Sequence, residues 1–309
     1  MENPEVKALF KYRSLRAGVD ADGKPIYNKN TIKMLQENTA WMANPNTFND
    51  PFDCNYRPLS ADIKNGDKLF SKNIELTEVE AAIYQAYKNK PTQEEEIKML
   101  FRLTEYRNNQ IQNAVQSHRV FSLSEDWDQI LLWSHYADNH SGVCLGYERS
   151  EGSLLSSNMC RPVRYRKRYL RYDHSDYLNF LERNSTNSGP WQDGFNIITN
   201  ALFTKSEDWF YEKEWRLVQR LLIFDKSVGF NLEIDAPLRC VVFGCMTPKE
   251  DKEYVQSTLG DSVRYFQAWK SKEHHTLDIY PLEECEARIK FHEEETEYIA
   301  GLGGDLHFT

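Results

Sequence analysis

The sequence predicts a single α+β domain with a mixed or antiparallel sheet core. Two observations carry this prediction. Short β-friendly runs separated by turn residues recur along most of the 309 residues, and one long charged region at about 60–118 has helical periodicity instead. The length allows one large domain or two modest ones, and we expect one. Since no apolar run approaches the roughly 20 residues that span a bilayer, we expect no membrane segment.

The composition narrows the class of protein. A hydrophobic content of 40% and a charged content of 28% are ordinary, and the net charge of −9 disfavours non-specific coating of nucleic acid. It leaves room for a local basic patch. The six cysteines are scattered without Cys-x-x-Cys spacing, and the first residues lack a signal-peptide apolar run. We therefore expect reduced thiols and a cytoplasmic protein.

The first fifty residues contain two expected strands around one helix. Polar, glycine and proline residues mark the turn between them, and an apolar stripe marks the helix. In chain order we expect a strand over 9–12 that ends at Arg13, a turn over 20–25, a helix over 31–37 capped by Asn30 or Thr31, and a strand over 40–43.

Residues 44–53 form a shaped loop, because residues before proline favour extended geometry and Asn and Asp favour turns. One interpretation is a rigid connector. The other is a loop that lines a pocket, with Phe48 and Phe52 as apolar walls and Asn49 and Asp50 as polar groups.

The region at about 60–118 is expected to be a helical insertion. Ile97, Leu100 and Phe101 lie on one helical stripe, and the glutamates before them suit a helix N-terminus. The charges indicate a solvated face, and the insertion could act as a lid or a substrate-selecting element.

The rest of the chain alternates between strands and helices. Ser122 and Ser124 share one face of their expected strand, and Gly142 is placed to end the helix before it. We expect strands over 119–124, 143–147, 229–234, 239–244, 262–269 and 276–280, helices over 128–138, 191–204 and 248–259, and a tail that frays.

Residues 161–172 hold six basic residues interleaved with three tyrosines. As a strand, this segment places Arg164, Arg166 and Arg168 on one face, where they could bind phosphates or, with the tyrosines, stack on bases. The alternative is a solvated edge strand whose charge blocks edge-to-edge pairing.

The stretch over 209–216 is the strongest candidate site. As a strand it places Glu212, Glu214 and Arg216 on one face and aromatic residues on the other, so that two carboxylates face a cleft. As a helix it would offer only a Glu212–Arg216 pair worth about 0.3–0.5 kcal/mol. The β-friendly run over 217–223 favours the strand.

Other chemistries have weaker support. His135 and His140 are five residues apart, which does not place two ligands on one helix face, so we expect no metal site. Asp50 and Asp53 alone do not make a magnesium site. The sequence has no phosphate loop and no Gly-x-Ser-x-Gly motif, and Cys144 is expected in the core. His135 is either structural or in contact with a ligand.

Three clusters, together with Lys11-Tyr-Arg13, resemble a bacterial family known as domain of unknown function 2971. This resemblance spans most of the chain, and Asp53 stands where the family commonly has glutamate. The clusters are Phe48-Asn-Asp-Pro-Phe-Asp53, Trp133 to Tyr147, and Tyr211-Glu-Lys-Glu-Trp-Arg216.

The order of three short motifs is also similar to the Arg–Ser–Glu arrangement of ADP-ribosyltransferases. The matching positions are Arg13, Ser122 with Ser124, and Glu212 with Glu214, whereas the helix that contains His135 has no counterpart that we can map. This resemblance implies an ADP-ribosyltransferase-like sheet and NAD as substrate. The NAD-binding residues it suggests are Arg13, Tyr12, Ser122, Ser124, Phe48, Asn49, Asp50, Phe52, His135 and Tyr136.

The implied chemistry is cleavage of the nicotinamide–ribose bond, which builds an oxocarbenium-like sugar. A fixed carboxylate stabilises such a cation, and Glu214 is the first choice for this role. Glu212 would act as base toward the acceptor. Arg13 would bind the diphosphate through its forked donors.

Three functions follow as expectations. The first is a mono-ADP-ribosyltransferase of the toxin or antiphage type, acting on an unidentified protein or nucleic acid. The second is a nucleic-acid hydrolase or nuclease that uses Asp50, His135 and Glu214 together. The third is a non-catalytic ligand- or protein-binding module whose aromatic motifs are core packing.

Overall fold

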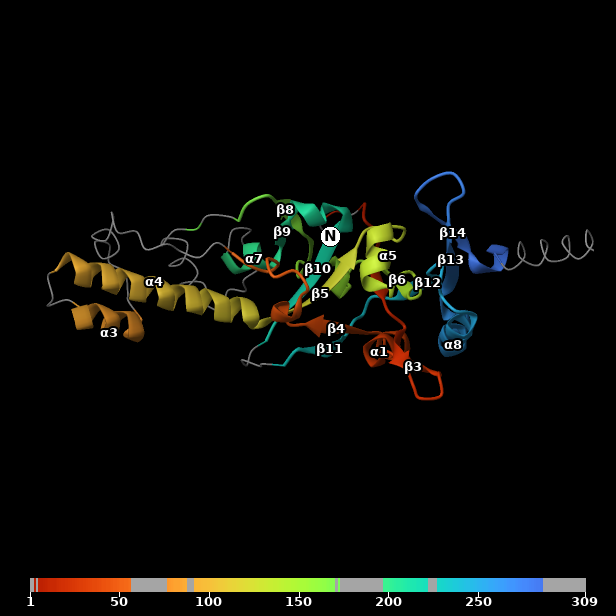
Figure 1. Cartoon of the computed structure of the whole chain (residues 1–309), viewed down its shortest axis with the longest axis horizontal. Coiled ribbons are helices and arrows are strands. Elements are labelled where there is room, and N and C mark those ends of the chain that lie inside the picture. Colours follow the sequence, from red (N-terminus) through yellow and green to blue (C-terminus); the bar gives the residue numbers. More distant parts are fainter. Residues whose placement is uncertain are drawn as a thin grey trace, which may run out of the picture.

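The computed structural model describes residues 3, 5–56, 77–87, 92–169, 172, 197–221 and 227–285. Its centre is a mixed, strongly curled sheet in which eight strands follow the order β11-β4-β5-β1-β6-β12-β13-β14 (Figure 1). Two further strands branch from this path, since β10 pairs with β5 and β7 pairs with β10. The expected α+β class with a mixed sheet is confirmed.

The N-terminal elements follow the expected order, with the helix beginning two residues earlier than expected. Asn28 is its cap, because the Asn28 side chain accepts from the backbone N–H groups of Asn30 and Thr31. The prediction of Asn30 or Thr31 as cap was therefore wrong. The elements are β1 (Ala8–Arg13), β2 (Arg16–Val19), β3 (Pro25–Tyr27), α1 (Lys29–Glu37), β4 (Thr39–Ala43) and the 3₁₀ turn η1 (Pro45–Thr47).

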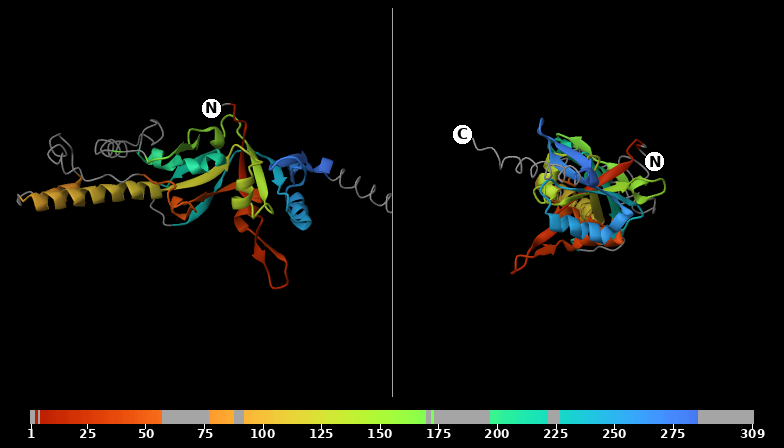
Figure 2. Two further views of the ribbon diagram at one scale, coloured as in Figure 1. Left: turned by 45° about the horizontal axis from the view of Figure 1, so that its top comes forward. Right: turned by 90° about the vertical axis from the view of Figure 1, so that its right-hand side faces the viewer.

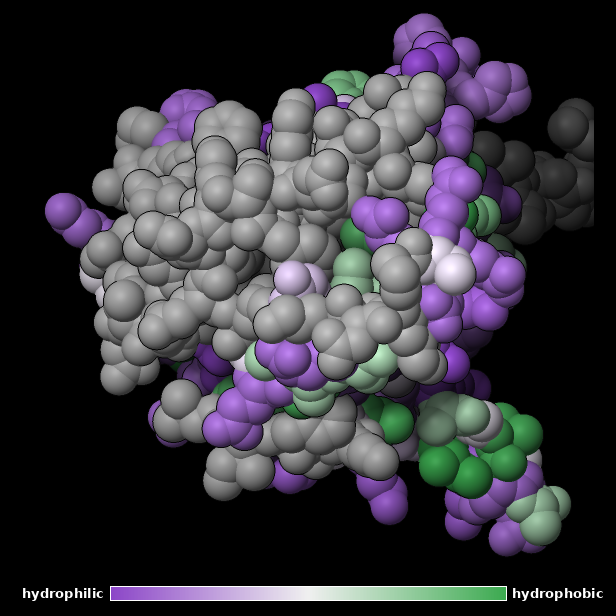
Figure 3. Space-filling view, turned by 90° about the vertical axis from the view of Figure 1, so that its left-hand side faces the viewer, coloured by the Kyte–Doolittle hydropathy of each residue, from purple (hydrophilic) through white to green (hydrophobic). Residues whose placement is uncertain are grey.

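Strands β2 and β3 form a hairpin that projects from the body of the molecule (Figure 2). Its apolar side chains Val19 and Ile26 are exposed. In Figure 3, which views the molecule from the α3–α4 end, the hairpin projects at the lower right and shows hydrophobic residues beside hydrophilic ones.

The described part of the predicted insertion consists of two helices, α3 (Glu78–Tyr87) and α4 (Gln93–Gln116). Each begins with a Thr-x-x-Glu capping box, formed by Thr77 with Glu80 and by Thr92 with Glu95. The two helices lie side by side and extend away from the sheet (Figure 1). Neither they nor any other helix in the described ranges is long and apolar enough to cross a membrane.

The middle of the chain contributes the inner strands. Gly142, predicted to stop a helix, lies after a left-handed run over 138–140, and its N–H donates to the Ala137 carbonyl. A Cβ at Gly142 would lie 2.2 Å from the Arg13 carbonyl oxygen, so close approach of two backbones requires the glycine. The elements here are β5 (His118–Ser124), α5 (Ile130–Tyr136), β6 (Val143–Glu148) and η3 (Leu154–Ser156).

The basic segment and the candidate stretch are more broken than expected. Residues 209–212, predicted as strand, belong to a 3₁₀ helix that ends at Lys213 in the left-handed conformation. The predicted helix over 191–204 falls outside the described residues up to 196. The elements are β7 (Cys160–Pro162), β8 (Arg164–Arg166), α7 (Ile197–Leu202), β9 (Thr204–Ser206), η4 (Glu207–Glu212) and β10 (Glu214–Arg220).

The C-terminal elements match their predicted positions within a few residues. Strands β12 and β13 pair in parallel, which makes the sheet mixed. The elements are β11 (Gly229–Glu233), β12 (Leu238–Phe243), α8 (Lys249–Leu259), η5 (Gly260–Ser262), β13 (Arg264–Lys270) and β14 (Leu277–Pro281). The predicted tail after residue 285 lies outside the described residues. All six cysteines are free thiols, as expected.

The two faces of the central strand pair β5–β10 have different tasks. Leu123 and Phe121 on β5, with Trp215 and Leu217 on β10, pack into the largest hydrophobic core. The alternate residues face the other side, where polar groups replace apolar ones at the Glu214 end of the pair. This side carries the candidate site.

Candidate functional site

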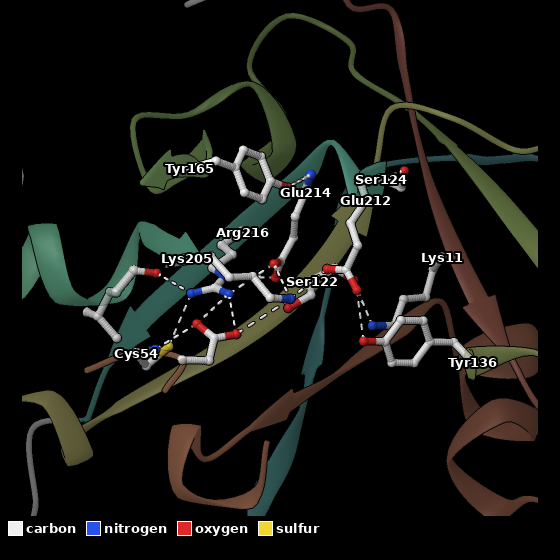
Figure 4. A network of polar contacts seen from close by, with 12 residues as sticks. Lys11, Cys54, Ser122, Ser124, Tyr136, Tyr165, Lys205, Glu212, Glu214 and Arg216 are labelled. Carbon is white, nitrogen blue, oxygen red and sulfur yellow. Dashed lines mark hydrogen bonds and ion pairs between the residues drawn. The ribbon is translucent and has the colours of Figure 1, made fainter. Parts of the chain in front are cut away.

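A cavity of about 390 Å³ lies where β1, β5 and β10 meet α5 and the loop after η1. Its walls combine aromatic rings with charged groups, and Figure 4 shows the charged network around it. The lining residues are Phe10, Lys11, Tyr12, Thr47, Phe48, Asn49, Asp53, Ser122, Leu123, Ser124, Leu132, His135, Tyr136, Lys205, Glu212 and Glu214.

A fork in the sheet creates this space. Strand β5 pairs with β1 only at Ser124 and with β4 only at Val120. Strands β1 and β4 therefore diverge from each other near Ser122, which lies between these two positions. The Lys11 ammonium donates to the Ser122 carbonyl oxygen at 2.6 Å. A lysine side chain therefore satisfies a backbone acceptor at the fork, where no strand partner is paired with Ser122 on that edge.

Arg216 holds two carboxylates on the floor of the site. Its guanidinium is fully buried and donates to Glu214 at 2.7 and 2.9 Å and to Asp53 at 2.6 and 2.8 Å. It also donates to the Leu202 carbonyl at 2.7 Å. The forked donors of arginine thus fix both carboxylates in one orientation.

Lys205 joins the carboxylates from the other side. Its ammonium lies 2.6 Å from Glu212, 3.1 Å from Glu214 and 3.7 Å from Asp53. The ammonium takes the place among these carboxylates that a cation would otherwise occupy. In the described part of the chain, no group of three or more His, Cys, Asp or Glu side chains is arranged to hold a metal ion.

Glu212 reaches the cavity from η4 and not from a strand. The left-handed turn at Lys213 (φ 40°, ψ 50°) separates Glu212 from β10, yet both Glu212 and Glu214 point to Lys205. The Tyr136 hydroxyl donates to Glu212 at 2.9 Å, and the Glu212 carbonyl accepts from the Ser124 hydroxyl. The predicted convergence of the two carboxylates is present, although half of the predicted strand is absent.

The surroundings drive the pKa values of the two glutamates apart. Burial raises the pKa of Glu212, and its contact with Lys205 only partly offsets this. Burial acts in the same direction on Glu214, but Arg216 and Lys205 lower the pKa of that carboxyl to about 2. Glu214 is therefore a permanent anion, whereas Glu212 takes up a proton more readily. Such a separation is typical of acid–base pairs.

The two lysines differ in the same way. Burial lowers the pKa of Lys11 to about 7, and the neighbouring Arg13 adds to this effect. For Lys205, burial also opposes the charge, but Glu214, Glu212 and Asp53 raise its pKa above the ordinary value. Lys205 stays charged, and Lys11 titrates near neutrality.

Most of the predicted site residues line this one cavity. The exceptions are Arg13, Asp50 and Phe52. The Arg13 Nε donates to the Thr31 hydroxyl at 3.2 Å, Asp50 accepts from the Phe52 N–H, and Phe52 lines a neighbouring cleft. The predicted residues that line the cavity are Tyr12, Phe48, Asn49, Ser122, Ser124, His135, Tyr136, Glu212 and Glu214.

The sequence reasoning missed Lys11, Lys205 and Asp53 as members of the site. Lys11 was part of a quoted motif, and Asp53 ended the shaped loop, so both had a sequence signal. Lys205 had none, because its role depends on β9 lying beside β8 and under the two glutamates.

The other candidates have ordinary surroundings. The Cys144 thiol is fully buried in β6, and burial raises its pKa well above the usual value. His140 Nε2 lies 3.0 Å from the Ser134 hydroxyl, outside the cavity. Of Cys144, His135 and His140, His135 alone lines the cavity, with its ring 6.3 Å from that of Trp209.

Fold and site together define an α+β protein with a curled mixed sheet and an aromatic-walled cavity that holds a buried ion network. Residues 132–217, less than a third of the chain, match the family described as "Protein of unknown function (DUF2971)". The match includes Tyr136, Lys205, Glu212, Glu214 and Arg216. No curated protein and no solved structure matches the chain.

Proposed function

We propose that the protein is an NAD-dependent mono-ADP-ribosyltransferase, of the kind that toxins and antiphage effectors use. One observation supports this most: two glutamates with opposite protonation tendencies converge on one lysine inside an aromatic-walled cavity. Cleavage of an N-glycosidic bond needs a fixed negative charge near the sugar and a separate group that takes a proton.

Glu214 would supply the fixed charge. Its low pKa keeps it anionic, and Arg216 prevents it from rotating away from the cavity. Positive charge that develops on the ribose would be stabilised by an oriented carboxylate, which needs no reorganisation during the reaction. The bond that breaks joins the ribose anomeric carbon to nicotinamide, which leaves neutral with the electron pair.

Glu212 would accept the proton of the attacking nucleophile. The pKa of Glu212 is raised toward neutral pH, which makes this carboxylate a better base. Lys205 and the Tyr136 hydroxyl each bond one of its two oxygens. The new bond joins the nucleophile to the same anomeric carbon. Phe48 and Tyr136 are the cavity-lining rings on which nicotinamide would stack.

The diphosphate requires another partner than the one the family resemblance implies. Arg13 donates to Thr31 and does not line the cavity, whereas Lys11 does. We therefore assign the charge-neutralising role at this end of the cavity to Lys11.

The two competing functions fit the geometry less well. A nuclease site of Asp50, His135 and Glu214 would need all three in one space, but Asp50 lies outside the cavity. A non-catalytic module would use the ion network for structure alone. The experiment below separates that case from catalysis.

The test measures the release of nicotinamide from NAD by chromatography. The reaction is run with and without cell-derived protein and nucleic acid as acceptor. We expect turnover by the wild type and a loss of at least about 100-fold in Glu214→Gln, the range for removal of a transition-state contact. Glu212→Gln should reduce transfer to the acceptor more than nicotinamide release.

Glu125→Gln is the matched control, since this carboxylate accepts from the Trp215 indole and does not line the cavity. It should keep turnover close to the wild-type rate. An absence of NAD binding and turnover in the folded wild type, or equal rates in wild type and Glu214→Gln, would exclude the proposed function.

A further inference from the structure

Two open clefts lie beside the catalytic cavity, along the basic segment. One, of about 510 Å³, is lined by Phe52, Arg166, Lys167, Arg168, Tyr169 and Lys205 among others. The second is lined by Arg164, Tyr165, Arg166, Glu207, Asp208 and Phe210. The clefts share Arg166 and Asp208, and the first shares Lys205 with the cavity. They form one track that ends at the site, which we call the basic track.

The cations of the basic track are largely uncommitted. Within the described ranges, Lys167 pairs with Glu207 at 3.1 Å, whereas Arg164, Arg166 and Arg168 have no carboxylate at ion-pair distance. Glu207 and Asp208 also line the track and reduce its positive charge. Free arginines on a chain with net charge −9 mark a local anion-binding surface.

Aromatic rings stand exposed along the same track. Phe52 is 65% exposed, Phe210 63% and Tyr169 39%. Burial of such rings would be favourable, and planar bases stack on them. Because rings and cations recur over two adjoining clefts, the track fits a repeating phosphate-and-base polymer better than one nucleotide.

The track is mechanically tied to the proposed catalytic strand. Tyr165 lies between Arg164 and Arg166 on β8, and its hydroxyl accepts from the Glu214 N–H at 2.7 Å. Strand β8 pairs with β9 so that Tyr165 lies opposite Lys205. A ligand bound to Arg164 or Arg166 therefore contacts the immediate sequence neighbours of Tyr165. Tyr165 bonds the Glu214 backbone and lies opposite Lys205, which contacts both glutamates.

We propose that the basic track binds single-stranded nucleic acid and leads it to the mouth of the catalytic cavity. Phosphates contact Arg166 and Arg168, and bases stack on Phe52, Tyr169 and Phe210. That the bound strand is also the acceptor of ADP-ribose rests on the function proposed above, whereas the binding itself does not.

Fluorescence anisotropy with labelled 16-nucleotide single-stranded DNA and RNA tests the binding in low salt. We expect Arg166→Glu/Arg168→Glu and Phe52→Ala/Phe210→Ala each to weaken binding at least tenfold. Two phosphate contacts predict a slope of about −1.4 for log affinity against log salt. The four substituted side chains are exposed and carry no described ion pair, and thermal melting checks that each variant is folded.

The matched control is Arg264→Glu/Lys270→Glu, which reverses two exposed charges on β13 at the other end of the sheet. It should bind as the wild type does, and duplex DNA and ATP should compete poorly. The proposal is overturned if neither strand binds, if the control weakens binding equally, or if duplex or ATP competes as well as the single strand. Strand binding is measured on the wild type without NAD, so loss of NAD turnover and loss of strand binding are separate results.

Discussion

At the scale of residues, the site depends on how each charge is compensated. Glu214 contacts Arg216 and Lys205, while Glu212 contacts Lys205 and a neutral tyrosine hydroxyl. All of these groups except Tyr136 are nearly inaccessible to solvent. Removal of one partner from such a network leaves the other charge buried without compensation.

We therefore expect Glu214→Gln to cost about 3–5 kcal/mol in the free energy of unfolding, because it leaves Arg216 short of a counter-charge. Glu212→Gln should cost clearly less, since burial already favours the protonated form of this side chain. Urea unfolding at pH 7 measures both. Equal losses would show that the two carboxylates are not differently stabilised.

Lys11 predicts a pH dependence of stability. Its folded pKa of about 7 lies below the ordinary 10.5, so the unfolded chain binds more protons between these values. Stability contributed by Lys11 should therefore rise with pH across that window, by at most about 1.4 kcal/mol per pH unit.

The measurement is the difference in unfolding free energy between the wild type and Lys11→Met at pH 7, 8 and 9. Groups that titrate identically in both proteins cancel in this difference. A difference that stays constant with pH would contradict the lowered pKa of Lys11.

At the scale of elements, the left-handed turn at Lys213 sets how η4 meets β10. A non-glycine residue in this conformation costs about 1–2 kcal/mol, and a β-branched one costs more. We expect Lys213→Gly to stay within about 1 kcal/mol of the wild type, because relief of strain offsets the lost ion pair with Asp126.

Lys213→Ile loses the same ion pair and adds strain, so it should be less stable than Lys213→Gly by at least about 1 kcal/mol. Thermal and urea unfolding of the two variants compare them directly. If isoleucine is tolerated as well as glycine, residue 213 does not adopt the left-handed turn.

The junction between α5 and β6 makes a second prediction at this scale. A Cβ at Gly142 would lie 2.2 Å from the Arg13 oxygen and 3.0 Å from the Ala137 carbonyl carbon, both of them backbone atoms. Gly142→Ala should cost about 3 kcal/mol or more, since backbone cannot move aside as a side chain does.

Gly18→Ala is the control, because no atom lies within 4 Å of a Cβ at that position. Its unfolding free energy should change by less than about 0.5 kcal/mol. Similar behaviour of the two variants would mean that the β1–α5 approach is looser than described.

At the scale of the whole molecule, we expect the helical pair α3–α4 to unfold independently of the sheet. Arg107 and Glu80 form an ion pair at 2.8 Å with both side chains almost fully buried. Glu80→Gln removes this buried counter-charge of Arg107 and should cost about 3–5 kcal/mol. Because this ion pair joins α3 to α4, the loss of stability should be confined to these two helices.

Hydrogen–deuterium exchange locates the effect. We expect faster exchange in α3 and in the N-terminal half of α4, with β5 and β10 still protected. Global loss of protection would show that the sheet depends on the helical pair.

The sequence predicted the order of elements and most of the cavity lining because both follow local rules. The period of two in β5 predicted that Ser122 and Ser124 share one face. The proline, Asn and Asp residues of the loop over 44–53 predicted that Phe48 and Asn49 line a pocket. What it lacked was register. Lys205 enters through the β8–β9 pairing, and nothing local marks that contact. Arg13 failed to join because its side chain turns to α1, where the Nε donates to the Thr31 hydroxyl.

The Thr-x-x-Glu boxes were a local signal that went unused, and they would have fixed the starts of both α3 and α4. The 3₁₀ helix at 207–212 could not be anticipated from alternation. In a strand, Glu212 and Glu214 would face the same side. The left-handed turn at Lys213 also directs both side chains to Lys205, so the carboxylates converge in either case.

The most direct test of the proposed function is a crystal structure of the wild-type protein with a carbocyclic NAD analogue, whose nicotinamide bond resists cleavage. We predict the nicotinamide ring between Phe48 and Tyr136, with the sugar-like ring hydrogen-bonded to Glu214. An analogue bound elsewhere on the molecule, or a cavity that stays empty at saturating concentration, would contradict the assignment of the Glu212–Glu214 site to NAD.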